Sequence, residues 1–278
     1  MNTITAQNIR EYLSNLATEE KSPATIEKYA CALRAFAASL SGGEATKEAA
    51  IAYKERLKQL YAANTVNGAI AALNGFFRFM RWGFKIKPLK IVRSAFLPKE
   101  KELTKAEYAR LLAAAKSEGN ERLNLVMQAI CSTGIRVSEL QFFTVEAAHA
   151  GQAEVTNKGK TRPVFMPAKL KAALLAYAKR RGISSGCIFI TAGGKPLDRK
   201  NIWADMKKLC RAAGVEPSKV FPHNLRALFA RTLYGMEHDI AKLADLLGHS
   251  SIDTTRIYIR ESGEAHRRLI EKLGLVTE

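Results

Sequence analysis

The C-terminal stretch Leu246-Leu-Gly-His-Ser-Ser-Ile-Asp-Thr-Thr-Arg-Ile-Tyr258 concentrates the signals that decide how this chain folds. Gly248 predicts the end of one helix, and a serine after it can cap the next, which is expected over residues 252–259 and contains Tyr258. Nine residues along one straight helix turn through about 900°, which would place His249 and Tyr258 on opposite faces. The predicted break between the two helices removes that conflict, so an imidazole and a phenol can converge on one point.

Another helix start is predicted just upstream, at Pro222-His-Asn-Leu-Arg226. Proline is favoured in the first helical turn, and His223 and Arg226, three residues apart, share a helix face. This spacing is common by chance and is weak evidence alone. Together with His249 and Tyr258 it gives a cationic, hydrogen-bonding cluster beside a phenol, a set that can bind a phosphodiester and attack it.

Arg136 is a further candidate for this cluster, in the run Cys131-Ser-Thr-Gly-Ile-Arg-Val-Ser-Glu-Leu140. Gly134 can end one helix in a left-handed cap, which places Arg136 at the start of the next element. A guanidinium fork matches two phosphate oxygens better than a lysine ammonium does. Taken alone, Arg136 would be interpreted as an ordinary surface ion-pair residue.

The composition favours a polyanionic partner. The chain carries a formal net charge of +18, and lysine and arginine exceed the acidic residues on both sides of Pro98. Because 47% of the residues are hydrophobic, a folded core is expected and a disordered basic tail is excluded. Solubilising surface charge is the plainer interpretation. A membrane surface is disfavoured, because no basic cluster flanks an apolar anchor.

The N-terminus lacks the basic and apolar regions of a signal peptide, and no apolar run reaches the roughly 18 residues of a membrane helix. We therefore expect a cytoplasmic protein with no membrane partner. The four cysteines are far apart and form no C-x-x-C pair, so reduced thiols are expected rather than disulfides or a zinc site. They are Cys31, Cys131, Cys187 and Cys210.

The periodicity predicts a mainly α fold with a small antiparallel β-hairpin, organised in two domains. Residues 1–95 are expected to form a four-helix unit, in which Ser22-Pro23 opens one helix. Residues 96–103 are expected to form a linker. The second domain, 104–278, begins at the start of a capping box on Thr104. An amphipathic helix is expected at 262–273.

The hairpin is predicted from Ala153–Thr156 and Arg162–Met166, joined by the turn Asn157-Lys-Gly-Lys160. Pro163 cannot donate a ladder hydrogen bond, which favours an edge hairpin. In the first domain, basic residues between 78 and 93 alternate with aromatic ones. We expect the aromatic side chains to lie in the core and the basic ones to face a nucleic-acid backbone.

Two weaker patterns are set aside. Gly193-Gly-Lys195 lacks the full phosphate-loop pattern and predicts only a turn. His149, His238 and His266 have no partners at metal-ligand spacing, so no metal site is expected.

The order and spacing of five residues resemble those of the tyrosine recombinase (phage integrase) family. They are Arg136 in Thr-Gly-Ile-Arg-Val-Ser-Glu-Leu, His223-x-x-Arg226, Leu-Gly-His249, and Tyr258 nine residues later. The resemblance is strong in 125–165 and 220–260 and generic in the first 95 residues. The family also uses a lysine on a β-hairpin turn. Lys158 matches that position best, with Lys160 as the alternative.

The resemblance implies a site-specific DNA recombinase that works through a 3′-phosphotyrosine intermediate. It implies these roles: Arg136 and Arg226 bind the non-bridging phosphate oxygens, His249 adds a hydrogen bond, Tyr258 attacks phosphorus, His223 is the general base, and Lys158 protonates the leaving 5′-oxygen. No metal, ATP or other cofactor is implied, because the phosphotyrosine bond conserves the energy needed for rejoining.

The resemblance also implies double-stranded DNA held between the two domains and a homotetramer on paired sites. The apolar stripe of the C-terminal tail would dock on a neighbouring subunit, or alternatively on its own domain. That stripe is formed by Ala265, Leu269, Ile270 and Leu273.

Two other functions use the same chemistry or fold: DNA relaxation of the type IB topoisomerase kind, and a catalytically silent DNA-binding regulator. The run Arg226-Ala-Leu-Phe-Ala-Arg231 departs from the usual Xer continuation, which has histidine after that arginine. This departure favours a mobile-element or inversion enzyme over a chromosome-dimer role.

Overall fold

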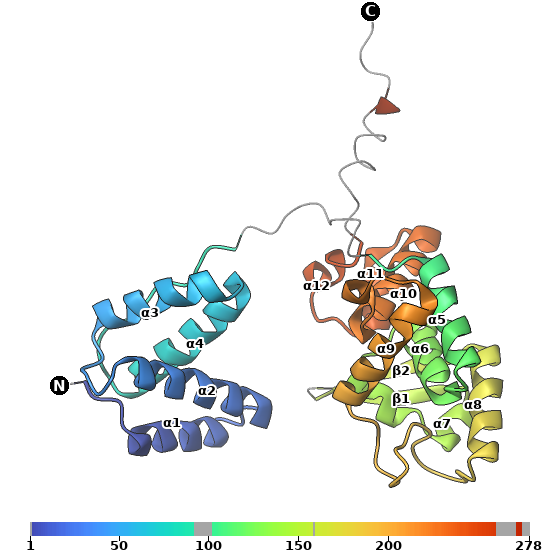
Figure 1. The fold of residues 1–278 in the computed structure, drawn as a ribbon, viewed down its shortest axis with the longest axis horizontal. Coiled ribbons are helices and arrows are strands. Elements are labelled where there is room, and N and C mark those ends of the chain that lie inside the picture. The colour runs from blue at the N-terminus through green and yellow to red at the C-terminus, as the bar shows by residue number, and fades with distance from the viewer. Residues whose placement is uncertain (1, 92–101, 158, 260–270, 274–278) are drawn as a thin grey trace, which may run out of the picture. The chain divides into compact units, whose positions relative to one another are not determined.

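The computed structural model describes residues 2–91, 102–157, 159–259 and 271–273. The chain separates into two compact units, Met1–Arg93 and Ser94–Glu278, each with its own hydrophobic core (Figure 1). Both units are built mainly from helices, and the described residues contain one two-stranded antiparallel sheet. The predicted fold class is therefore confirmed.

The first unit consists of four helices packed around a core of aliphatic and aromatic side chains. They are α1 (Ala6–Thr18), α2 (Pro23–Ser39), α3 (Lys47–Leu60) and α4 (Ala63–Phe79). Ser22 caps α2 through its side chain, and Pro23 occupies the first turn, as the sequence predicted. Helix α2 packs against each of the other three.

The aromatic residues after α4 face this core, as predicted. Trp82 and Phe84 pack on Phe77, with ring centroids 5.6 and 4.8 Å away. Phe79 lies at the margin, because 36% of its surface is exposed while its ring contacts Tyr12. Basic side chains of the same stretch line a surface cavity of about 640 Å³; they are Arg78, Arg81 and Lys85.

The second unit is arranged around helix α6 (Glu121–Thr133), which packs against four other helices. Those helices are α5 (Lys105–Ser117), α8 (Ala168–Arg180), α9 (Arg199–Ala213) and α10 (Pro222–Glu237). Thr104 and Glu107 form the predicted capping box of α5. The 3-10 turn η2 (Val137–Phe142) begins directly after Arg136, where the sequence predicted the start of a new element. The short helix α7 (Val145–Ala150) and the 3-10 turn η3 (Pro217–Lys219) were not predicted.

The hairpin consists of β1 (Gln152–Asn157) and β2 (Lys160–Phe165), paired antiparallel with Asn157 opposite Lys160. Ala153 and Val155 turn inward to the core of the second unit. Pro163 lies opposite Glu154 in a sheet of only two strands, so its missing N–H is tolerated at an edge. Lys158 lies outside the described residues.

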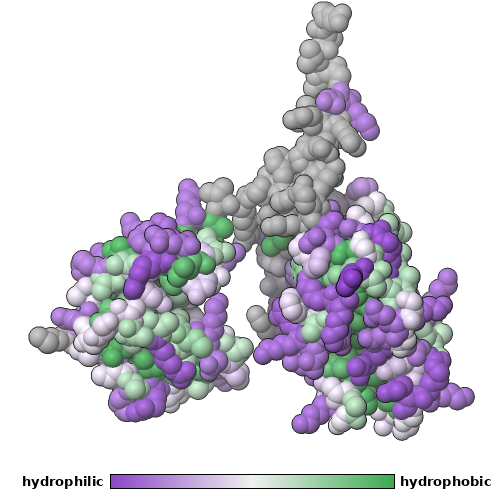
Figure 2. Space-filling model, in the orientation of Figure 1, coloured by the Kyte–Doolittle hydropathy of each residue, from purple (hydrophilic) through white to green (hydrophobic). Residues whose placement is uncertain are grey.

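Two short helices close the described part of the unit: α11 (Ile240–Leu247) and α12 (Ile252–Arg256). The predicted tail helix falls almost entirely outside the described residues. The four cysteines are free thiols, as expected, and Gly193-Gly194-Lys195 lies in a turn. None of the described helices is both long and apolar enough to cross a bilayer. Figure 2 shows hydrophilic side chains over much of the visible face of each unit.

Candidate active site

The site forms where the end of α6, the start of α10 and the end of α11 meet. Gly134 ends α6 in the left-handed conformation, with φ of 67°. A Cβ at this position would lie 2.4 Å from the Phe229 ring of α10, so glycine is required for space as well as for backbone conformation. Because of this close approach, Arg136, two residues later, lies beside the first turn of α10.

Arg226 is the buried centre of the site, with 1% of its surface exposed. Its guanidinium donates hydrogen bonds to the main-chain oxygens of Gly134 and Leu247, and to Nε2 of His249 at 2.9 Å. Burial, followed by the charge of Arg136, lowers the pKa of Arg226 to about 10. It remains a cation at neutral pH, and it joins α6, α10 and the end of α11.

His249 is held on both ring nitrogens. Its Nδ1 lies 2.8 Å from Oγ1 of Thr255, a fully buried side chain, and its Nε2 faces Arg226. An arginine can only donate, so Nε2 accepts and the proton of the neutral ring is on Nδ1, donated to Thr255. Burial and the charges of Arg226 and Arg136 lower the pKa of His249 to about 4. The imidazole is therefore neutral near pH 7.

Tyr258 is buried, with 6% of its surface exposed. Its ring stacks on His249 at a centroid distance of 5.7 Å and contacts His223 at 5.2 Å. The sequence placed Tyr258 within the last helix, and this was wrong: α12 ends at Arg256. After α12 the chain forms a 3-10 turn, in which the Tyr258 N–H donates to the carbonyl of Thr255, three residues earlier.

The predicted break between α11 and α12 is confirmed. Gly248 adopts φ of 63° and ψ of 47°, and Ser251 caps α12 through a hydrogen bond from Asp253 N. This turn brings His249 and Tyr258 together despite their nine-residue separation.

His223 lies in the first turn of α10 and is exposed to solvent. Desolvation lowers the pKa of its imidazole, and so do the charges of Arg226, Arg136 and Arg199. Because the side chain keeps accessible surface, the charges of the three arginines lower this pKa more than desolvation does. The neutral imidazole that results is able to accept a proton.

Arg136 is held by a carboxylate that sequence reasoning did not select. Glu139 is 2% exposed and accepts hydrogen bonds from the Arg136 N–H at 2.8 Å and from its Nη1 at 2.9 Å. Arg162, on β2, donates to Oε2 of this carboxylate at 2.8 Å, the same oxygen that accepts from the Arg136 N–H. Burial alone would raise the pKa of Glu139, but these hydrogen bonds and charges hold it below its usual range. The carboxylate is thus ionised between two arginines.

A cavity of about 520 Å³ opens beside this group. Its lining includes Arg136, Asn157, Lys160, Arg162 and His249. All five side chains carry a hydrogen-bond donor, and three of them are cationic against one carboxylate in the lining, Asp245, so the cavity suits an anion. Lys160 lies at it, whereas Lys158 is outside the described residues. The choice of lysine therefore stays a prediction.

The structure adds Glu139, Arg162 and Thr255 to the residues found from the sequence. Glu139 had a local signal, because its position three residues after Arg136 is that of a capping box. Thr255 precedes Tyr258 by three residues, which alone predicts nothing. No sequence pattern pointed to Arg162, because its partner Glu139 is distant along the chain.

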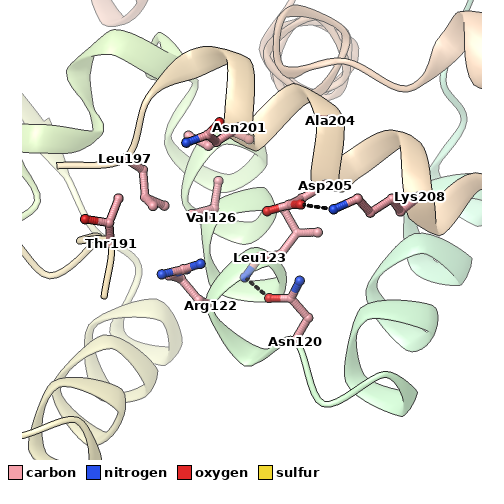
Figure 3. A pocket seen from close by; sticks show the side chains of 11 residues that line it. Asn120, Arg122, Leu123, Val126, Thr191, Leu197, Asn201, Ala204, Asp205 and Lys208 are labelled. Atoms are coloured by element: carbon pink, nitrogen blue, oxygen red, sulfur yellow. Dashed lines mark hydrogen bonds and ion pairs between the residues drawn. The ribbon is translucent and has the colours of Figure 1, made fainter. Parts of the chain in front are cut away.

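A second cavity, of about 230 Å³, lies between α6 and α9 and is lined by a different set of residues (Figure 3). Its charged side chains are satisfied locally: Asp205 pairs with Lys208 at 2.9 Å, and Arg122 donates to the Ile190 carbonyl. Among the described residues, no three His, Cys, Asp or Glu side chains are grouped closely enough to hold a metal ion.

Comparison with known proteins gave matches along the chain. Residues 101–264 match the Phage integrase family, and residues 9–83 match the Phage integrase, N-terminal SAM-like domain. Tyrosine recombinase XerA of Thermococcus kodakarensis is 31% identical over 279 residues, covering 96% of this chain and 95% of the relative.

Solved structures give the same picture. The crystal structure of XerA recombinase matches with a TM-score of 0.55 and 25% identity, covering 99% of this chain and all of that one. A lambda integrase dimer bound to a COC′ core site matches with a TM-score of 0.74, covering 93% of this chain and 96% of the other. At 20% identity, that second match shows likeness of fold alone.

Proposed function

Because the chain belongs to the phage integrase family, whose enzymes are tyrosine recombinases, we propose that Tyr258 is the residue with which it cuts and rejoins DNA strands at specific sites. The observation that carries this assignment is the position of the phenol. The Tyr258 ring contacts both His249 and His223, and His249 is hydrogen-bonded to the buried Arg226.

In the proposed reaction, Oη of Tyr258 attacks the scissile phosphorus and the bond from phosphorus to the 5′-oxygen breaks. The phenol proton passes to His223, whose lowered pKa keeps it neutral and ready to accept. The leaving 5′-oxygen takes a proton from Lys158 or Lys160. The products are a 3′-phosphotyrosine and a free 5′-hydroxyl, and attack by a 5′-hydroxyl reverses both steps.

The two arginines would stabilise the phosphate as negative charge develops on its non-bridging oxygens. Arg136 borders the cationic cavity, and a third of its side chain is exposed, which suits a direct contact. Arg226 keeps a spare donor for such a contact, because its Nε–H is buried without a hydrogen-bond partner while its Nη groups donate to His249 and to two carbonyls.

His249 needs one change before it can donate to the phosphate. In this structure its Nε2 accepts from Arg226, so a proton must be placed on that nitrogen first. A bound phosphate supplies the negative charge that favours the imidazolium. We therefore propose that engagement of the scissile phosphate is coupled to proton uptake at His249.

Double-stranded DNA is the proposed substrate, supported by the net charge of +18 and by the DNA-bound state of the lambda integrase relative. We also propose a homotetramer on paired sites, because lambda integrase has been seen as a tetramer on a Holliday junction. A recombinase acts where its DNA lies, so the cytoplasm is the proposed location.

Trapping a covalent complex on a nicked suicide DNA tests the nucleophile. Tyr258→Phe should bind DNA as the wild type does and form no adduct, because the ring packing is kept and only the hydroxyl is lost. Tyr177→Phe is the matched control: Tyr177 is as deeply buried, at 4% exposure, but lies in α8, and its variant should still form the adduct. An adduct formed by Tyr258→Phe at the wild-type rate would overturn the assignment.

A further inference from the structure

We propose that Arg162 is a positioning residue for departure of the 5′-oxygen. Through Glu139 it would hold the hairpin, and with it the lysine of the hairpin turn, in a fixed relation to Arg136. The inference rests on the proposed strand-transfer reaction and adds to it the means by which the general acid is placed.

The contacts that carry the proposal come from both stems of the hairpin. Arg162 on β2 donates to Oε2 of Glu139 at 2.8 Å, and Asn157 at the end of β1 approaches Oε1 at 3.4 Å. Arg136 donates to both of these oxygens. One buried carboxylate therefore connects the arginine that binds phosphate to the two strands that flank the lysine turn.

Arg162 is also confined by the end of α11. A Cβ on Gly248 would lie 2.3 Å from Nε of Arg162, so the glycine leaves the space through which this side chain passes. The side chain is 14% exposed, and its Nη1 is buried without a hydrogen-bond partner. A buried, incompletely satisfied cation costs stability, and its retention in the site fits a positioning role better than a purely structural one.

Positioning matters here because proton transfer is sensitive to distance. A general acid must lie within hydrogen-bond reach of the oxygen that it protonates, and an error of about 1 Å can cost about 100-fold in rate. The inward side chains of β1 fix the base of the hairpin in the core, whereas Gly159, Lys160 and Thr161 are exposed. The link through Glu139 is the contact that joins this outer part to Arg136.

The test uses the leaving group. Replacing the bridging 5′-oxygen of the DNA by sulfur produces a thiolate on cleavage, and a thiol with pKa of about 8.5 leaves without a proton, unlike an alcohol. We expect Arg162→Ala to cut the ordinary phosphodiester about 100-fold more slowly. It should cut the sulfur-bridged DNA at close to the wild-type rate. Arg162→Lys, which keeps the charge, should show a smaller defect with the same recovery.

Several variants make the result specific. Arg136→Ala should stay slow on both substrates, because it loses phosphate contacts and not proton donation. Arg180→Ala, which removes an exposed arginine–glutamate pair elsewhere in the unit, should cut both at the wild-type rate. Equal slowing of Arg162→Ala on both substrates would overturn the inference, because it would mean general disruption or loss of phosphate binding.

The lysine variants separate this inference from the proposed function. If Lys158→Ala or Lys160→Ala recovers on the sulfur-bridged DNA while Arg162→Ala does not, the proposed reaction stands and the role of Arg162 is wrong. If neither lysine variant recovers, the lysine is not the general acid, and both proposals about the leaving group fail.

Discussion

The two arginines assigned to the scissile phosphate lie in halves of the site that are built in opposite ways. In the buried half, formed by α10 to α12, Arg226 is 1% exposed and its donors serve the protein's own main chain and His249. In the open half, formed by η2 and the hairpin, Arg136 has a third of its side chain exposed and is held by the carboxylate of Glu139. The comparison shows that Arg226 is part of the packed interior and stabilises the fold, whereas Arg136 lies at the surface and is held in position by a neighbouring side chain.

The largest expected difference follows from replacing each arginine by alanine. Arg226→Ala leaves two buried carbonyls and a ring nitrogen without donors, so it should lower the free energy of unfolding by about 2–4 kcal/mol. Arg136→Ala should lower that free energy by only about 1 kcal/mol, because the main-chain N–H of residue 136 and Arg162 still donate to the buried carboxylate of Glu139. Both should reduce cleavage of suicide DNA by about 100-fold or more. Urea unfolding and a cleavage time course measure the two effects.

Equal destabilisation by the two substitutions would break the comparison. It would mean that the Arg136–Glu139 pair contributes as much to the fold as the buried half does.

A smaller loss of stability is expected from a substitution at Gly134, at the end of α6 between the two halves. Gly134→Ala brings a methyl group into the Phe229 ring, in addition to the strain of a positive φ. Gly214 ends α9 in the same left-handed conformation with open space around it, so Gly214→Ala measures the backbone strain alone. Gly134→Ala should destabilise by about 1–3 kcal/mol more than Gly214→Ala in thermal or urea unfolding. Similar losses would show that α10 can move away from α6 at little cost.

The last expected effect is a change in the slope of stability against pH, and it belongs to the buried half. The pKa of His249 is about 4 in the folded protein, against about 6.5 for an unperturbed histidine. Between these values the unfolded chain binds a proton that the folded chain does not. The free energy of unfolding should therefore fall as pH is lowered from about 6.5 to about 4, with a shallower fall in His249→Gln.

Bound DNA should reduce this dependence, since a phosphate favours the protonated ring. If wild type and His249→Gln lose stability in parallel over this range, the ring is not held neutral by Arg226 and the proposed coupling to proton uptake fails.

The sequence predicted those features that depend on neighbours along the chain. The left-handed end of α6 at Gly134, the capping box at Thr104 and the break at Gly248 are local signals, and each is confirmed. The end of α12 before Tyr258 was missed, because fraying of a last turn leaves no clear residue pattern.

Contacts between distant residues could not be predicted in this way. The pairing of Glu139 with Arg162 joins a 3-10 turn to a strand, and the single sequence contains no sign of it. The tautomer of His249 follows only from knowing that Arg226 faces Nε2. The order of the motifs therefore predicted which residues form the site. Their hydrogen-bond partners could be identified only from the structure.

The acceptors of Arg226 have a consequence for how this site can change over evolutionary time. Two of them are main-chain oxygens, at Gly134 and Leu247, and a carbonyl is supplied by whichever residue occupies the position. Drift at Leu247 leaves its acceptor intact as long as the helix still ends there. The contact between Glu139 and Arg162 is made by two side chains, so a change at either position removes it. The two main-chain contacts in the buried half thus depend on the identity of one residue, Arg226, and on the path of the backbone. The contact in the open half depends on the identity of two residues, which would have to change together.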